Sequence, residues 1–280
     1  MSSFAQITSF ESIPSEILSE IEGLREKTIT NSDLAEGSCN YEGEPWIEES
    51  LKKGITVWSS KSKITKARHF RVSMVIDVEN ISVEQIYDNI SRYELRKKWD
   101  SVLNQPRTVR TYVREDGNAT DVVRYMTKEA AGGLISPRVF TDIRMFFGNV
   151  GDSSSIIGGS IALKQELFKH IHANAAHEGS GDSITSFNSA VKYTPAEEKC
   201  TVAENLPGGG LRVDIIDEKT ATGKMRVRLT MSSHTKLGGW LPQALVNSST
   251  GNAMAGIFEN YVANFASFSD GAKCEIVFNL

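Results

Sequence analysis

Residues 224–231 alternate between polar and apolar side chains, and this pattern limits the fold more than any other in the chain. Successive side chains of a strand point to opposite faces of a sheet. Met225, Val227, Leu229 and Met231 therefore share one face, and polar residues occupy the other. Because strands buried on both faces are apolar throughout, the alternation predicts an antiparallel sheet with one apolar and one wet face.

Other segments predict the neighbours of this strand. Stretches rich in β-branched and aromatic residues indicate further strands at residues 54–60, 69–76, 108–113, 121–126, 139–146, 183–191 and 210–216. The polar turn at residues 115–118 predicts a hairpin between two of them.

Three helices are expected around these strands. Apolar residues at helical spacing follow Ser12, and a second helix has Ser82 as its cap with Gln85 three residues on. A third helix begins at Pro242 and runs toward Phe265. The order of elements indicates an α+β fold in which the last helix buries its apolar stripe against an antiparallel sheet.

Residues 148–182 differ in composition from the strands around them. Glycine and serine flank a short helix that is expected at residues 161–171. We interpret the segment as an insertion into a loop, where additional chain costs little free energy.

Composition and charge argue against several classes of protein. A net charge of -4 over 280 residues disfavours nucleic-acid binding, which depends on clustered Lys and Arg. The sequence has no apolar run of about 18–20 residues and no signal-peptide pattern at its start, so we expect a cytoplasmic protein. Cys39, Cys200 and Cys274 show no CxxC spacing, and we expect reduced thiols.

Motifs for catalysis and for metal binding are missing from the sequence. GxSxG, HExxH and GxGxxG do not occur. His170, His172 and His177 lie close together in the chain, but their spacing does not place them on one helical face with an acidic ligand. We therefore expect no enzymatic activity, no metal site and no cofactor.

Three stretches, in order, carry a family resemblance. They read Arg-Lys-Lys-Trp-Asp at 96–100, Ala-Ala-Gly-Gly-Leu-Ile-Ser-Pro-Arg-Val-Phe at 130–140, and Leu-Gly-Gly-Trp-Leu-Pro at 237–242. Together they resemble START domains, the StAR-related lipid transfer family, and most closely its sterol-carrying subgroup. The resemblance implies a helix-grip fold, in which a curved antiparallel sheet wraps around a long C-terminal helix and encloses a cavity for one lipid.

The resemblance also implies a division of the chain. Residues 45–268 are expected to form the START-like lipid-binding domain, with the insertion at 148–182. Residues 1–44 then supply an N-terminal helix and a polar lead-in, and residues 269–280 form a C-terminal tail.

The same resemblance suggests headgroup residues. In the sterol subgroup, a buried arginine downstream of the Pro-Arg-x-Phe motif faces an acid on the neighbouring strand. Counting from the motif gives Arg144, with Arg138 inside the motif, but the position of the acid is occupied by Tyr125. Because a buried arginine needs a partner, either Asp142, Asp121 or the Tyr125 hydroxyl compensates, or the ligand is anionic. Arg144 as a surface residue is the alternative.

The last helix and the loop before it provide further candidates. Thr250, Met254, Ile257 and Tyr261 follow helical spacing and form either a lipid-facing stripe or plain core. Trp240 and Leu241 either insert at a membrane interface, where tryptophan is favoured, or fold over the edge of the core.

We therefore predict a non-enzymatic, monomeric carrier that holds one lipid, cholesterol or another sterol first, and moves it between membranes. It contacts membranes transiently and peripherally and binds no nucleic acid. A phospholipid or ceramide ligand, and a lipid-sensing regulatory module without transfer activity, are the alternatives.

Overall fold

The computed structural model describes residues 15–100, 102–113, 119–149, 155–162, 193–268 and 271–278. This part of the chain contains a sheet of 12 strands whose paired neighbours are antiparallel except for β6 and β8. The strands are β1 Ile47–Lys52, β2 Ile55–Ser60, β3 His69–Glu79, β4 Leu103–Val113, β5 Ala119–Thr127, β6 Arg138–Asn149, β7 Ser155–Ala162, β8 Thr201–Val202, β9 Glu204–Asn205, β10 Gly210–Asp217, β11 Met225–Lys236 and β12 Lys273–Ile276. The helices are α1 Ser15–Ser32, α2 Val83–Ser91, α3 Tyr93–Arg96, α6 Gln243–Ala263 and α7 Phe265–Phe268, with 3-10 turns at Ala131–Gly133 and Glu197–Lys199.

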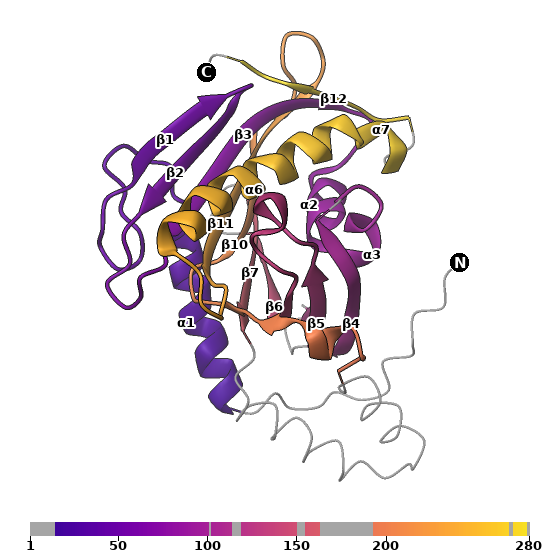
Figure 1. Cartoon of the computed structure of the whole chain (residues 1–280). Helices are drawn as coiled ribbons and strands as arrows, with labels where there is room; N and C mark the ends of the chain where they lie inside the picture. The colour runs from indigo at the N-terminus through magenta and orange to yellow at the C-terminus, as the bar shows by residue number, and fades with distance from the viewer. Residues whose placement is uncertain are drawn as a thin grey trace.

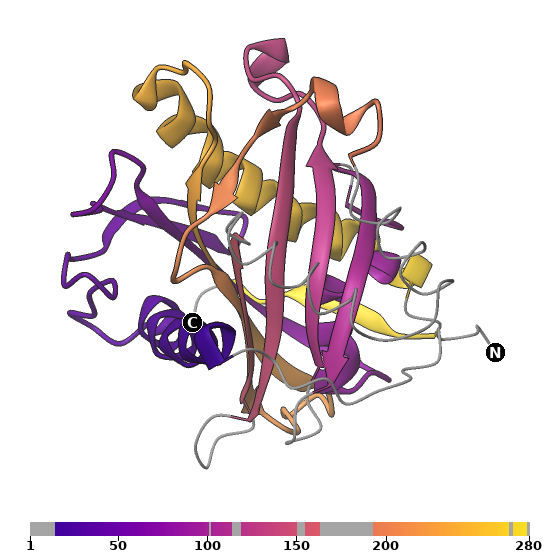
Figure 2. The ribbon, with the colours of Figure 1, turned by 90° about the horizontal axis from the view of Figure 1, so that it is seen from below.

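The sheet curves around α6, the longest of the described helices (Figure 1). The strand order is β1-β2-β3-β11-β10-β7-β6-β5-β4. α6 crosses one face, where it contacts β2, β3 and β12, and we call this the inner face. α1 packs on the opposite, outer face against β7, β10 and β11 (Figure 2). The predicted α+β architecture, a curved antiparallel sheet around a C-terminal helix, is confirmed.

The apolar core lies between α6 and the inner face. Phe258 and Tyr261 of α6 are fully buried, and each large apolar side chain removed from water contributes about 1.5–3 kcal/mol. At Gly251 the helix comes so close to the sheet that a Cβ atom there would lie 3.2 Å from the Val57 side chain and 3.5 Å from that of Phe70. No described helix is long and apolar enough to cross a membrane.

The predicted start of α2 is confirmed in detail. Ser82 accepts a hydrogen bond from the Gln85 backbone, and the Gln85 side chain accepts one from the Ser82 backbone. This reciprocal capping satisfies two backbone donors that the first turn leaves free. Tyr87 of α2 reaches β7, where Gly158 leaves room for it, because a Cβ atom on Gly158 would lie 1.7 Å from the Tyr87 hydroxyl.

The prediction of an insertion at residues 148–182 is wrong in part. Ser155–Ala162 form β7, which pairs with both β6 and β10 in the sheet. Its two glycines and two serines hide the strand pattern, although Ile156 and Ile157 are buried. The helix expected at 161–171 therefore begins within a strand; residues 163–182 and the strand expected at 183–191 lie outside the described residues.

The two ends of the described chain pack on the sheet rather than flank it. Leu24 and Thr28 of α1 are buried on the outer face, and the Thr28 hydroxyl donates to the Gly209 carbonyl. At the other end, β12 pairs with β3, beside β2. Hence α1 and residues 271–278 contribute to the same packed body as the core of the predicted domain.

The polar face of β11 is wet only over part of its length. Arg226 forms an ion pair with Asp77 at 2.7 Å and is half-buried. Further along, Thr230, Ser232 and His234 are almost completely buried, because α1 and neighbouring loops cover this end of the outer face. The alternation predicted the strand and its apolar face correctly, but it gave no sign of the cover on the other side.

Candidate ligand-binding site

Polar side chains gather on the inner face of the sheet among aromatic residues. The alternation of β6 places residues 140, 142, 144 and 146 on this face, and Phe146 packs against Tyr87 of α2 at a ring-centroid distance of 5.2 Å. The register of β5 and β6 sets an acid opposite an arginine and a tyrosine opposite Phe140. The group, called here the inner polar cluster, consists of Asp121, Tyr125, Asp142, Arg144 and Asn205.

Arg144 is held by an acid on the neighbouring strand. Its Nη2 donates to Asp121 Oδ2 at 2.6 Å, its Nη1 donates to the Ser91 carbonyl, and its guanidinium lies 5.0 Å from the ring centroid of Tyr93. Burial lowers the pKa of Arg144, but Asp121 and the nearby tyrosines more than offset this, so the pKa lies above its ordinary value. Of the compensations that the sequence left open, Asp121 is the partner found.

Asp142 is a completely buried carboxyl group with one oxygen left over. Its Oδ2 accepts hydrogen bonds from Asn205 Nδ2 at 2.7 Å and from Ser160 Oγ at 3.2 Å. Its Oδ1 has no hydrogen-bond partner among the described residues. Burial raises the pKa of Asp142 to about 6, although bonds from Asn205, Ser160 and Tyr125 limit the rise. An unsatisfied buried acceptor costs about 1–3 kcal/mol, so this position suits a ligand that brings a donor.

Tyr125 stands where the resemblance implies an acid. Its ring stacks on Phe140 with centroids 4.8 Å apart, and its hydroxyl accepts a hydrogen bond from Asn205 Nδ2 at 3.0 Å. Burial raises the pKa of Tyr125 well above 10, which keeps the phenol neutral. The cluster therefore holds a neutral hydroxyl at this position, and Asp142 supplies a carboxyl group with one unpaired oxygen, Oδ1.

Asn205 links these groups and was missed by the sequence analysis. Its Oδ1 accepts from Thr235 Oγ1 at 3.0 Å, which turns both amide hydrogens toward Tyr125 and Asp142. It lies in the two-residue strand β9, 63 positions from Asp142, so no local pattern could reveal the contact. Asp142, named earlier only as a partner for Arg144, carried a signal: it is the one acid within the apolar run 139–147.

Arg138 lies apart from the cluster, buried at the start of β6. Its Nε donates to the Leu237 carbonyl at 2.7 Å, and its Nη1 donates to both oxygens of Ser136 at 2.6 Å. These bonds join the loop before β6 to the loop before α6. Through these bonds Arg138 links the two loops.

The predicted stripe on α6 divides into two parts. Met254 and Tyr261 are buried in the core, where Tyr261 packs edge-to-face on Trp99 with ring centroids 5.3 Å apart. Thr250 and Ile257 are half-buried on one flank of the helix. Met254 and Tyr261 are thus packed in the core, whereas Thr250 and Ile257 keep accessible surface.

The loop before α6 presents an apolar side chain to the surroundings. Trp240 is 92% exposed, and Leu241 beside it is half-buried. Leu134, on the loop that Arg138 joins to this one, is 68% exposed. Trp240 does not fold over the core edge, and the two loops together expose large apolar groups at one end of the molecule.

Two features of the outer face lie away from this cluster. A hollow of about 250 Å³ at the end of α1 is lined by charged side chains that include Arg212, Asp214 and Arg228, which do not suit a hydrocarbon. In the described part of the chain, the side chains with the spacing of metal ligands are Glu42, His69 and His234. Glu42, His69 and His234 lie far apart in the sequence, so no local spacing predicted this group.

Comparison with solved structures places this geometry among known proteins. Human StAR-related lipid transfer protein 5 matches with a TM-score of 0.66 and 19% sequence identity, over 91% of this chain and 99% of that one. The chain has the helix-grip fold of START domains. Human STARD10 matches this START fold with a TM-score of 0.54 and 16% identity, over 94% of this chain and 86% of that one. The sequence matches no family model and no curated protein, so the similarity is visible in the fold.

Proposed function

We propose that this START-fold chain binds one lipid with a hydroxyl-bearing headgroup, a sterol such as cholesterol first, between the inner face and α6, and carries it between membranes. The observation that carries the proposal is the Asp142 carboxyl group, which is completely buried and leaves Oδ1 without a hydrogen-bond donor. A lipid hydroxyl supplies that donor without bringing a charge into the site.

The surroundings of Asp142 favour a neutral hydroxyl over an anionic headgroup. Arg144 is already paired with Asp121, and the neighbouring Tyr125 hydroxyl is neutral because burial raises its pKa. An anionic phosphate beside the Asp142 carboxylate would meet repulsion that no free cation of the cluster offsets. We propose Asp142 and Tyr125 as the headgroup contacts and Arg144 as the residue that positions β5 against β6.

Some side chains of the inner face keep accessible surface that a ligand could cover. On β6 the outward-facing Val139, Ile143 and Met145 are buried, whereas the inward-facing Arg144 and Phe146 keep accessible surface. A ligand placed there would cover this surface, with about 25 cal/mol gained per Å² of apolar area. We propose that Thr250 and Ile257 of α6 contact the lipid, and that Met254 and Tyr261 hold the helix on the sheet behind them.

Exchange with a membrane needs a contact surface, and the proposal assigns it to Trp240 and Leu241. Tryptophan is favoured at the membrane interface, and Trp240 is almost fully exposed with Leu134 on the adjoining loop. Arg138 clamps these two loops together, so the surface would approach the membrane as a unit. The contact is transient and peripheral, and the carrier acts as a cytoplasmic monomer.

Mass spectrometry of lipids that copurify with the protein from eukaryotic cells tests the proposal. We expect a sterol at about one molecule per chain in the wild type, and a much smaller amount in Asp142→Leu. Asp217→Asn, which changes an exposed acid at the end of β10, is the matched control and should retain the ligand.

Other outcomes of this measurement are equally informative. A phospholipid in place of the sterol would overturn the neutral-headgroup assignment, and ceramide would keep the hydroxyl but change the lipid class. In a separate assay of transfer between vesicles, bound sterol without transfer would favour a sensing module over a carrier. A wild-type protein without lipid would contradict the proposed binding site.

A further inference from the structure

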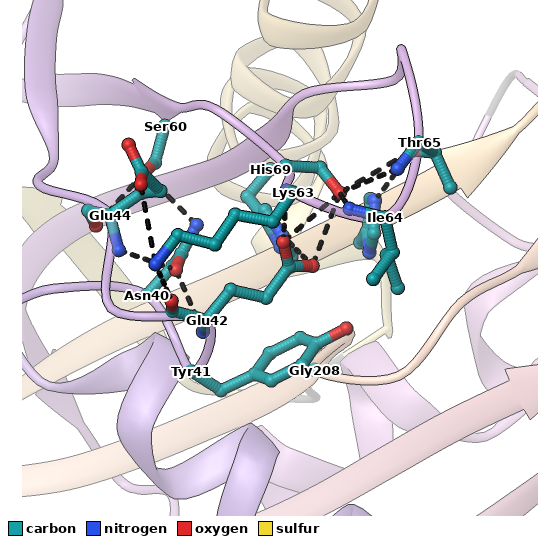
Figure 3. Close-up of polar contacts among 12 residues, drawn as sticks. Asn40, Tyr41, Glu42, Glu44, Ser60, Lys63, Ile64, Thr65, His69 and Gly208 are labelled. Carbon is teal, nitrogen blue, oxygen red and sulfur yellow. Dashed lines mark hydrogen bonds and ion pairs between the residues drawn. The ribbon is translucent and has the colours of Figure 1, made fainter.

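Glu42, His69 and His234 meet on the outer face of the sheet, where the proposed lipid site does not reach. Figure 3 shows the Glu42 side chain beside His69. Each offers one ligand atom, and these atoms all lie within 4.8 Å of one another. The side chain of His69 is fully buried, His234 is 1% exposed, and the Glu42 side chain is 6% exposed. Two imidazoles and a carboxylate are thus enclosed together in a protein interior.

The sheet itself brings the two rings together. His69 on β3 and His234 on β11 are direct cross-strand partners, and their rings are tilted by 34° with centroids 3.8 Å apart. Glu42, on the loop before β1, reaches His69 Nε2 with its Oε1 at 2.9 Å. His234 Nε2 lies 3.2 Å from the Thr65 hydroxyl. Donor atoms from four separate segments of the chain therefore converge on one small volume.

The donor set has the chemistry of a transition-metal site. Both imidazoles are buried, and His69 Nε2 lies 2.9 Å from Glu42 Oε1. Neutral imidazole is the form that binds metal, and two histidines with one carboxylate are a recurrent zinc ligand set. The backbone of Pro207 and of Ala67 also interacts with the His234 ring.

We propose that Glu42, His69 and His234 bind a divalent transition-metal ion such as Zn²⁺. The ion takes the place of the proton shared by His69 and Glu42, and the Thr65 hydroxyl or a water completes a tetrahedral shell. Bound there, it ties the segment before β1 to β3 and β11. This site does not depend on the proposed lipid binding, because it lies on the opposite face of the sheet.

A substitution of Asn31 distinguishes a metal site from a purely structural histidine pair. Its Nδ2 lies 3.4 Å from His69 Nδ1 and also donates to the Gly208 carbonyl, while its Oδ1 accepts from the Tyr41 backbone. When Nε2 of His69 holds a metal, Nδ1 carries the proton and needs an acceptor, which the present amide orientation does not offer. Asn31→Asp supplies a carboxylate acceptor, and such partners change metal affinity about 10–100-fold.

The experiment is a titration of the chelator-treated full chain with Zn²⁺ by calorimetry and with Co²⁺ by visible absorption. The background variant His170→Gln, His172→Gln, His177→Gln removes the other histidines of the sequence. We expect one ion per chain, tetrahedral cobalt bands, at least tenfold weaker binding in His234→Gln and in Glu42→Gln, and at least tenfold tighter binding in Asn31→Asp.

Several results would overturn the metal site. They are the absence of stoichiometric zinc or cobalt binding in the background variant, unchanged affinity in Glu42→Gln, or no gain in Asn31→Asp. If His234→Gln does not fold, Glu42→Gln decides the question, because the Glu42 side chain sits at the rim of the group and its amide keeps the same shape. Circular dichroism of each variant in chelator establishes that the fold is intact before metal is added.

Discussion

Replacing Asp142 by asparagine is expected to change how stability depends on pH. Burial raises the pKa of this carboxyl group from 3.8 to about 6. A shift of about two units corresponds to about 3 kcal/mol, since each unit is worth about 1.4 kcal/mol. Because the folded-state pKa lies above the unfolded one, this penalty is absent below about pH 4 and fully present above about pH 6.

The wild type therefore loses stability as the pH rises through that window, and Asp142→Asn does not lose this contribution. Between pH 4 and pH 7, the free energy of unfolding of the variant should therefore rise by about 3 kcal/mol relative to that of the wild type. Its absolute stability is set by a second effect. The amide NH2 group now replaces Oδ1, which has no partner, and an unsatisfied buried donor costs about 1–3 kcal/mol. The change with pH is hence the diagnostic quantity.

Urea unfolding at a series of pH values from 4 to 7 measures this difference, with lipid removed beforehand. All other titrating groups are shared, so they cancel between the two proteins. Asp217→Asn, at an exposed site, should follow the wild-type curve. A constant difference in the free energy of unfolding between wild type and Asp142→Asn over the whole series would refute the claim. Position 142 would then not hold a buried carboxyl group with a raised pKa.

Three further substitutions have defined outcomes. Arg144→Leu removes the partner of Asp121 and should lower the amount of bound lipid at unchanged far-ultraviolet circular dichroism; loss of the dichroism signal would make Arg144 a folding residue instead. Gly158→Ala places a methyl group on the Tyr87 hydroxyl and should cost about 1–3 kcal/mol in urea unfolding; adding Tyr87→Phe should recover part of it, and no recovery would show that another contact sets the cost. Trp240→Ala should leave unfolding unchanged, because the side chain is 92% exposed, and should reduce sedimentation with vesicles; equal sedimentation would argue against the membrane contact.

Much of the fold follows from local sequence patterns. The alternation in β11, the cap at Ser82 and the proline before α6 each depend on neighbouring residues, and each predicted element is present. β7 escaped prediction because its pattern is broken by Gly158 and its neighbour Gly159, which leave room for side chains of α2 and α1. The reason for these glycines lies in distant segments, and a single sequence does not display it.

The candidate site was predictable only in outline. Arg144 was placed by its resemblance to a motif, and its partner Asp121 became evident only through the register of β5 and β6. The hydrogen bonds of Asn205 and the meeting of His69 with His234 join segments separated by 63 and 165 positions. Contacts of this kind depend on how the sheet pairs, which the residues at either position do not encode by themselves.

The measurement that tests the central claim most directly compares binding of a sterol with binding of its O-methyl ether. The ether has no hydrogen to donate to Asp142 Oδ1, so the wild type should bind it roughly tenfold or more weakly, as expected when a buried acceptor stays unpaired. In Asp142→Asn an amide N–H faces the ligand and can donate to either oxygen, so the preference should largely disappear. Equal affinity of the wild type for both compounds, or the same preference in both proteins, would contradict recognition of a lipid hydroxyl by Asp142.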